Sequence, residues 1–279
     1  MGWVWLDGRL LREDEGLLAL ERAIFYGDGL FETLRICGGR PLFLGEHIKR
    51  LMEGAAVLGF AAALEPEALA CAVQETVAAN EATEGSVRLT VIRGRGPGLY
   101  PKASAPPLVL VTFRPGVPYA PELYVRGFKA IFVSFPRNER SPLVYIKSLN
   151  FLENILGKKE AAAKGADEGL FRNTAGYLCE GTVSNIFLVR EQTLVTPDVA
   201  SGLLPGVTRK VVIRLAREAG LPVAERPVRP EELFKADEAF LTNSLLEVMP
   251  LVAVEDRMIG DGKPGPVTCF LRERYARYR

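Results

Sequence analysis

The sequence predicts an α+β protein built from two domains, and three observations lead to this prediction. Stretches with the apolar pattern of strands are interleaved with stretches in which apolar residues recur at helical spacing. The chain has 279 residues, which is enough for two domains of ordinary size. Residues 114–122 contain three prolines and a glycine, which suits a linker better than a helix or a central strand. We therefore expect a small N-terminal α/β domain at residues 1–115, a linker at 116–122 and a larger C-terminal domain at 123–279.

The N-terminal domain is expected to contain several strands and two helices. Asp-Gly at residues 7–8 stands between two apolar runs, which predicts a hairpin of residues 3–6 and 9–11. Apolar residues recur at helical spacing from about residue 45 to 58, and Pro66 can open a second helix that runs to about residue 79. The other apolar runs predict strands at residues 31–36, 41–44, 86–93 and 107–113.

The C-terminal domain is expected to mix strands and helices in the same way. Gly220 is a natural end for the helix that precedes it. The helical segments are expected near residues 150–164, 207–219, 230–235 and 266–278. The strands are expected near residues 124–134, 168–172, 185–189, 193–195 and 238–242.

Charge and hydropathy exclude several classes of partner. The chain has 35 basic and 34 acidic residues, so its formal charge of +1 creates no field that would attract nucleic acid or an anionic membrane. No apolar run approaches the roughly 18 to 20 residues that span a bilayer. The first residues also lack a basic segment followed by a long apolar one. We therefore expect a cytoplasmic protein that acts on a small molecule and binds neither nucleic acid nor membrane.

Histidine and cysteine restrict the chemistry further. His47 is the only histidine, which excludes sites and mechanisms that need two imidazoles. The four cysteines are widely spaced and form no Cys-x-x-Cys pair, so we expect buried, reduced thiols and no metal site. If the protein is an enzyme, Lys, Tyr, Asp or Glu must move its protons, or a bound cofactor must supply the reactive group.

Two segments have the character of anion-binding turns. Pro-Gly-Val-Thr-Arg at residues 205–209 leads into a helix, whose free amide groups and dipole favour a phosphate, and Thr208 adds a hydroxyl. Thr-Asn-Ser at residues 242–244 follows a short apolar strand and is either a second such turn or a helix N-cap. Taken alone, each segment is better explained as an ordinary capped helix than as a phosphate site.

Lys147 and Glu180 are the two charged residues that stand out by their surroundings. Lys147 has apolar neighbours on both sides, and burial would lower its pKa and make the amine a nucleophile, although a snorkelling surface lysine has the same pattern. Glu180 lies in a polar turn before an apolar strand, where an acidic side chain is usually solvated. It becomes informative only beside a partner that needs a negative charge.

Six short motifs occur together in an order that resembles a known family, the class IV aminotransferases. These are Tyr-Gly-Asp-Gly-Leu-Phe-Glu-Thr-Leu-Arg at 26–35, Glu-His-Ile-Lys-Arg-Leu at 46–51, Lys-Ser-Leu-Asn at 147–150, Glu-Gly-Thr-Val-Ser-Asn-Ile-Phe at 180–187, Gly-Val-Thr-Arg at 206–209 and Thr-Asn-Ser at 242–244. The resemblance covers nearly the whole chain. It implies the two-domain fold type IV, which is D-amino acid aminotransferase-like, with a pseudo-barrel as the larger C-terminal domain.

The resemblance also implies a cofactor, pyridoxal 5′-phosphate (PLP), and a role for each motif. Lys147 would be the catalytic lysine that forms the Schiff base, and Glu180 would pair with the protonated pyridine nitrogen. Arg50, Val207, Thr208 and Ser244 would hold the phosphate. The remaining cofactor-binding positions would be Leu204 and Asn243. A homodimer is expected as well, because residues of the partner subunit border the active site in relatives.

The motifs place 4-amino-4-deoxychorismate lyase first among the members of this family. Phe31-Glu32-Thr33 and the short lysine segment are similar to those of the lyases, which release pyruvate and 4-aminobenzoate in folate biosynthesis. The expected substrate-binding residues are Phe31, Thr33, Arg93, Arg95 and Tyr100. The alternative is a transaminase of branched-chain or D-amino acids with 2-oxoglutarate, although residues 150–151 read Asn-Phe instead of Asn-Tyr and an Arg-x-His element is missing. Lys147 and Glu180 argue against a non-catalytic scaffold.

Overall fold

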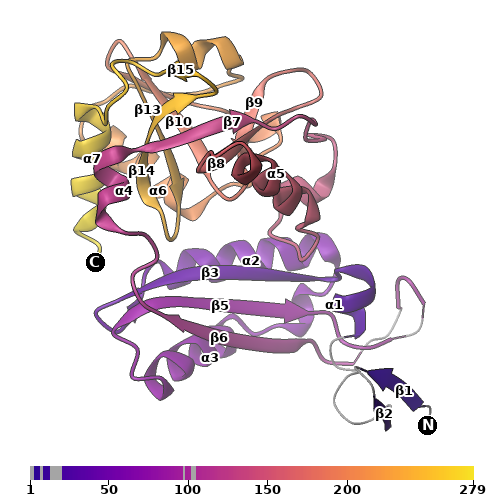
Figure 1. Ribbon diagram of the computed structural model, residues 1–279. Coiled ribbons are helices and arrows are strands. Elements are labelled where there is room, and N and C mark those ends of the chain that lie inside the picture. Colours follow the sequence, from indigo (N-terminus) through magenta and orange to yellow (C-terminus); the bar gives the residue numbers. More distant parts are fainter. Residues whose placement is uncertain (1–2, 7–8, 13–20, 97, 102–104) are drawn as a thin grey trace.

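Two separate β-sheets organise the computed structural model, which describes residues 3–6, 9–12, 21–96, 98–101 and 105–279 (Figure 1). A four-stranded sheet with the order β4-β3-β5-β6 is formed by residues 29–115. A nine-stranded sheet follows the path β12-β11-β10-β13-β14-β7-β8-β9, and β15 pairs with β14. We call the four-stranded sheet with its helices the N-terminal part, and the nine-stranded sheet with its helices the C-terminal part. The expected α+β class is confirmed.

The sheet of the N-terminal part is antiparallel throughout. Its strands are β3 (Gly29–Cys37), β4 (Arg40–Pro41), β5 (Glu84–Ile92) and β6 (Leu108–Pro115). The helices that pack against it are α2 (Leu44–Leu58) and α3 (Pro66–Ala79). Alternation along β3 turns Leu30, Leu34 and Ile36 into buried positions, while Phe31 and Thr33 point to the opposite face. The short helix α1 (Glu21–Tyr26) precedes β3, and the 3-10 turn Ala61–Ala63 joins α2 to α3.

The large sheet is mixed and almost entirely buried. Its strands are β7 (Phe128–Phe132), β8 (Glu168–Arg172), β9 (Leu178–Gly181), β10 (Asn185–Arg190), β11 (Thr193–Thr196), β12 (Val223–Glu225), β13 (Glu238–Asn243), β14 (Glu247–Val254) and β15 (Arg257–Met258). The helices of this part are α4 (Pro121–Arg126), α5 (Leu152–Ala163), α6 (Val207–Glu218) and α7 (Pro266–Ala276), with 3-10 turns at Pro142–Tyr145, Val199–Ser201 and Pro230–Lys235. α6 and α7 pack on β13, around Phe187 and Phe240, whose rings stack.

Most expected elements are present, and the amphipathic helices are the most accurate of them. The N-terminal hairpin is confirmed as β1 (Trp3–Leu6) paired with β2 (Arg9–Arg12), while the Asp-Gly turn between them lies outside the described residues. The strand expected at residues 41–44 is wrong, because β4 ends at Pro41 and Leu44 already starts α2. The domain boundary at 116–122 stays a prediction, although the small sheet ends at Pro115 and the large sheet begins at Phe128.

The strand expected at residues 124–134 is the clearest error. Residues up to Arg126 form α4 instead, because Pro121 opens the helix and Glu122 favours its first turn. Gly127, with φ 73°, ends the helix, and only Phe128–Phe132 is extended. β14 was not expected at all. It contains Pro250, and a proline argues against a central strand.

Two more expectations concern the burial of the cysteines and the absence of a membrane-spanning segment. All four thiols are free, but only Cys179 is buried, and Cys71 is exposed. The expectation of four buried thiols was therefore wrong. Among the described residues, no helix is both long enough and apolar enough to cross a membrane.

Candidate active site

A cavity of about 660 Å³ brings together side chains from both parts of the molecule. Most residues that the sequence singled out line it, and they come from six separate segments. These residues are Phe31, Thr33, Arg50, Lys147, Glu180, Leu204, Val207, Thr208, Asn243 and Ser244. Segments far apart in the chain thus meet at one site.

Lys147 stands at the junction of the two parts. Its carbonyl accepts a hydrogen bond from Phe31 N at 2.9 Å, and the amide of Leu149 bonds to the carbonyl of Gly29 at 3.0 Å, so β3 holds this segment in place. Its Nζ lies 4.3 Å from the centre of the Phe31 ring and 5.3 Å from that of Phe151. Burial, assisted by the nearby Arg50 cation, lowers the pKa of Lys147 from its ordinary value to about 8. Near neutral pH, a larger fraction of this amine is therefore uncharged and nucleophilic than of an ordinary lysine.

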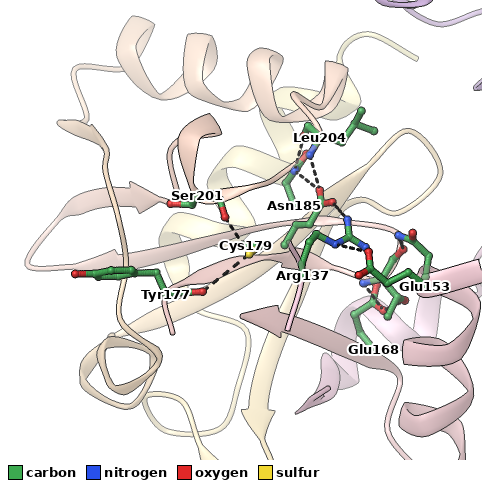
Figure 2. Close-up of polar contacts among 11 residues, drawn as sticks. Arg137, Glu153, Glu168, Tyr177, Cys179, Asn185, Ser201 and Leu204 are labelled. Atoms are coloured by element: carbon green, nitrogen blue, oxygen red, sulfur yellow. Dashed lines mark hydrogen bonds and ion pairs between the residues drawn. The ribbon is translucent and has the colours of Figure 1, made fainter. Parts of the chain in front are cut away.

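Glu180 is buried at one end of the cavity, in β9, and is not the solvated turn residue that the sequence suggested. Its Oε1 accepts a hydrogen bond from Arg137 Nη1 at 2.5 Å. Its Oε2 accepts from Leu204 N at 3.0 Å and from Asn185 Nδ2 at 3.2 Å (Figure 2). Burial raises the pKa of Glu180 to about 7, although Arg137 and the Leu204 amide act in the opposite direction. The carboxylate at this end is thus incompletely neutralised by the protein.

Arg137 was missed by the sequence analysis and connects this end to the cavity wall. Its guanidinium lies over the Phe171 ring at 4.1 Å, and its Nε is 3.2 Å from Glu153 Oε2 (Figure 2). Nε and Nη2 are buried and complete no hydrogen bond within the described part of the chain. Nothing in the residues around Arg137 distinguishes it from a surface arginine, so no sequence signal would have found it.

The opposite end of the cavity is formed by donors from both parts of the molecule. α6 begins there at Val207, and its N-cap Gly206 offers no side chain, which leaves the first amide groups of the helix without a cap. A Cβ at Gly206 would collide with the side chain of Asn185. Thr208 Oγ1 and Thr242 Oγ1 are buried and complete no hydrogen bond with the described residues, although the Tyr275 hydroxyl neighbours Thr208. Of the two interpretations of residues 242–244, the helix N-cap is wrong, since Thr242 and Asn243 end β13 and Ser244 begins the turn to β14.

Arg50 and Ser244 reach this end through a buried network that the sequence analysis did not connect. Glu32 accepts hydrogen bonds from Arg50 Nε at 2.8 Å and Arg50 Nη2 at 2.5 Å, and its Oε2 is 2.6 Å from His47 Nδ1. His47 Nε2 is 3.2 Å from Ser244 Oγ. A signal existed for this network, because His47 and Arg50 are three residues apart on one helix face and Glu32 is a charge between the buried Leu30 and Leu34.

The donor set at this end fits the phosphate of PLP. A phosphate dianion needs a cation, convergent hydroxyls and free amides, and Arg50, Thr208, Ser244 and the start of α6 offer these groups around one cavity. Glu180 at the other end fits a protonated ring nitrogen, which would supply the positive charge that this carboxylate lacks. The amine of Lys147 lines the same cavity and is close enough to interact with the charges of both Arg50 and Glu180.

Three expected substrate-binding residues lie away from the cavity lining. Arg93 is buried and bonds Asp28 Oδ2 at 2.8 Å and the carbonyl of Leu58, so its guanidinium is already engaged. Arg95 and Tyr100 are exposed and do not contribute to the lining within this chain.

Arg88 is the arginine of this strand that does line the cavity. It stands opposite Thr33 in the β3–β5 register and lies 3.8 Å from the Phe31 ring centre. Burial lowers the pKa of Arg88, and no ion pair with a carboxylate of the described residues neutralises it. The alternation of β5 could have revealed it, because Val87 and Leu89 are buried on the other face.

The comparisons with known proteins agree with this site. The sequence model of the family "Amino-transferase class IV" matches residues 29–254. A "Putative branched-chain-amino-acid aminotransferase" of Methanocaldococcus jannaschii is 35% identical over 277 residues, which cover 98% of this chain and 94% of that protein. The D-alanine aminotransferase of Bacillus licheniformis is 34% identical over 268 residues, covering 95% and 93%.

Solved structures resemble the chain over almost its full length. The branched-chain amino acid aminotransferase of Escherichia coli has a TM-score of 0.88 and 28% identity, covering 98% of this chain and 93% of that one. A "Putative 4-amino-4-deoxychorismate lyase" from Legionella pneumophila has a TM-score of 0.83 and 27% identity, covering 92% and 93%. Another similar branched-chain aminotransferase was solved with pyridoxamine 5′-phosphate. These similarities confirm the fold type IV architecture that the motifs implied.

Proposed function

Because the chain belongs to the class IV aminotransferases and is therefore a PLP-dependent enzyme, we propose that it transfers the amino group of branched-chain amino acids to 2-oxoglutarate. The observation that carries this proposal is the position of the low-pKa amine of Lys147 in one cavity with Glu180 and the phosphate-binding groups. The sequence had placed 4-amino-4-deoxychorismate lyase first. The transaminase alternative is better supported, since the relatives are mainly branched-chain aminotransferases.

Each residue would have a defined task in this reaction. Bound PLP supplies a ring that accepts the electron pair released at the α-carbon of the substrate. Glu180 would keep the ring nitrogen protonated, and Arg50, Thr208 and Ser244 would hold the phosphate. Lys147, as a free amine with a pKa of about 8, would take and return the α-proton as general base and acid. Leu204 and Asn243 would complete the cofactor-binding wall.

The cavity wall supports an apolar substrate side chain beside a carboxylate. Phe31, Leu143, Val144 and Phe151 line the cavity and offer apolar surface to a substrate side chain. Arg88 is the cation available to a substrate carboxylate on the face of Phe31 and Thr33. We assign this arginine to the dicarboxylate 2-oxoglutarate, in place of Arg93.

Purified protein loaded with PLP should produce glutamate from L-leucine and 2-oxoglutarate. Parallel reactions with D-alanine and with aminodeoxychorismate test the other two activities of the family. Glutamate formed from D-alanine but not from L-leucine would contradict the branched-chain assignment. Release of 4-aminobenzoate without amino transfer would restore the lyase.

We further propose a homodimer formed through an exposed apolar surface of α1 and α5. Ile24 and Phe25 are 63% and 67% exposed on α1, and Leu152 and Ile155 are 73% and 55% exposed on α5. The end of α1 lies near the start of α5, because Asn150 Nδ2, just before α5, donates to the carbonyl of Gly27, just after α1, at 3.0 Å. Exposed apolar patches of this kind mark protein interfaces. Sedimentation should give twice the chain mass of 30.6 kDa, and Ile155→Asp should shift the protein toward the monomer.

A further inference from the structure

His47 links the two parts of the molecule at the end of the cavity where the phosphate-binding groups converge. It belongs to α2 in the N-terminal part, whereas Ser244 belongs to the turn between β13 and β14 in the C-terminal part. Only 1% of the His47 surface is exposed, and both ring nitrogens are within hydrogen-bonding distance of a partner. The ring of His47 therefore connects Ser244 to Glu32 through its two nitrogens.

The proton positions in this chain follow from the charge of Glu32. Burial would raise the pKa of Glu32, but Arg50 and His47 outweigh it and lower the pKa to about 2. Glu32 is therefore ionised and can only accept, so His47 Nδ1 carries a proton. Burial lowers the pKa of His47 from its ordinary value, although Glu32 opposes this, so at pH 8 the ring of the cofactor-free protein is neutral and its Nε2 is an acceptor. The hydroxyl proton of Ser244 must then point to His47.

A phosphate beside Ser244 demands the opposite arrangement. A dianion accepts hydrogen bonds and cannot donate, so Ser244 contributes only if its hydroxyl proton turns away from His47. His47 Nε2 would then face the Ser244 oxygen without a proton between them. The arrangement is satisfied if the ring takes up one proton, which makes Nε2 a donor to Ser244 Oγ while Nδ1 still donates to Glu32.

We propose that His47 is a positioning residue that gains a proton when the phosphate binds and thereby turns the Ser244 hydroxyl toward the phosphate. The proposal rests on the proposed function, since it takes Ser244 as part of the phosphate site. The charged groups that act on His47 are Glu32 of β3, Arg50 of its own helix and Lys147 of the segment before α5. Glu32 stabilises the imidazolium, whereas Arg50 and Lys147 oppose it, so the added negative charge of the phosphate decides the balance.

Because the chain has a single histidine, nitrogen NMR can observe this proton directly. Full-length protein made without a histidine tag and labelled with ¹⁵N-histidine gives one pair of ring-nitrogen signals. Without cofactor at pH 8, Nδ1 should carry a proton and Nε2 should not. Saturation with PLP should protonate both nitrogens, whereas saturation with pyridoxal, which lacks the phosphate, should leave Nε2 unprotonated.

The outcomes separate the inference from the proposed function. If PLP saturates the protein, with its visible absorption band, and Nε2 stays unprotonated, the inference is wrong and the proposed function stands. If PLP does not bind, the proposed function itself is wrong. Protonation of Nε2 by pyridoxal as well would also overturn the inference, because the phosphate would then not be the cause.

Two variants give a second measurement that does not depend on NMR. PLP binding is measured for wild type and for His47→Gln across pH. As the pH rises through the pKa of His47, the dissociation constant of wild type should increase relative to that of the variant, by at most about ten-fold per pH unit. Lys147 and the cofactor titrate in both proteins, so the difference isolates His47. Ser244→Ala should weaken PLP about ten-fold and remove the same pH-dependent difference. Parallel pH profiles for wild type and both variants would refute the proposal.

Discussion

The two ends of the cavity each hold a buried carboxylate beside an arginine, yet the pKa values of these carboxylates move in opposite directions. Glu32 receives two hydrogen bonds from Arg50 and a third contact from His47, and its pKa falls to about 2 despite burial. Glu180 receives one bond from Arg137 and two from neutral groups, and burial raises its pKa to about 7. Burial is common to both, so the hydrogen bonds from a cation, two to Glu32 and one to Glu180, decide the sign.

This difference separates an anchor from a ligand-binding group. The charge of Glu32 is satisfied within the protein, which allows it to hold Arg50 and His47 in fixed positions. The charge of Glu180 is not, because Arg137 is shared with Glu153. A buried carboxylate with unused capacity for a cation suits a protonated ring nitrogen, and this is the role that the family resemblance implied.

The largest effect should come from the lysine that lines the same cavity. Lys147→Ala removes the amine that moves the α-proton, and we expect turnover of L-leucine to fall by about 10² to 10⁴-fold. Arg50, Thr208 and Glu180 are untouched, so the variant should still bind PLP non-covalently. Steady-state and single-turnover assays measure this loss. Lys159→Ala, on the exposed face of α5, is the control and should keep its activity.

The second test breaks the anchor. Glu32→Gln leaves Arg50 and His47 buried without their negative partner, which should cost about 3 to 5 kcal/mol of unfolding free energy in urea titrations. PLP affinity should fall as well, because Arg50 loses its fixed position. Glu84→Gln removes a carboxylate that is paired with Arg35 but 41% exposed, and it should cost only about 1 kcal/mol or less. Equal losses in both variants would show that Glu32 is not a special anchor.

The third test breaks the other end. Glu180→Gln keeps an acceptor for the Leu204 amide but removes the negative charge, and we expect turnover to fall by about 10² to 10³-fold. Stability should change little or even rise, since burial opposes this charge. Glu153→Gln is the matched control, because Glu153 shares Arg137 with Glu180 but is 39% exposed. A similar loss of turnover in both variants would mean that Arg137, and not Glu180, carries the effect.

In the cofactor-free protein, Glu180 and Glu32 should make the free energy of unfolding depend on pH in opposite directions. Glu180 binds its proton more tightly when folded, so its contribution to stability is present below pH 4.5 and is lost as the pH rises from 4.5 to about 7. Glu32 binds its proton less tightly when folded, so its contribution is present above pH 4.5 and is lost as the pH falls toward 2. Each slope is at most about 1.4 kcal/mol per pH unit. Urea unfolding across pH measures both slopes. Glu180→Gln should lose the slope between pH 4.5 and about 7, and Glu32→Gln should lose the slope between pH 4.5 and about 2.

The sequence predicted the parts of this site that depend on backbone motifs. Lys147, Glu180, Thr208 and Ser244 stand in short motifs whose order resembles a family, and each of them lines the cavity. It could not predict Arg137, because the value of that arginine arises from a contact with β9, across 43 residues of chain.

The same limit applies to secondary structure. Helical spacing located α2 and α6 to within a residue at their starts, because the pattern is local. β14 was missed, since its burial comes from β13 and β7 on either side and outweighs the cost of Pro250. Arg88 lies between these cases. Its strand was predicted, but its partner Thr33 is set by a register that no local pattern reveals.

The smallest expected effect concerns Arg88, which we assign to the substrate and not to the cofactor. Arg88→Gln removes the cation that faces the cavity beside Phe31 and Thr33, while the contacts of Glu32 and Glu180 stay intact. Loss of a charge-assisted hydrogen bond to a carboxylate costs about 1.5 to 3 kcal/mol, so KM for 2-oxoglutarate should rise about ten- to a hundred-fold. PLP affinity should not change. Arg114→Gln, on the exposed edge strand β6, is the control for a general loss of positive charge. If Arg93→Gln raises this KM and Arg88→Gln does not, the substrate carboxylate lies where the sequence first placed it.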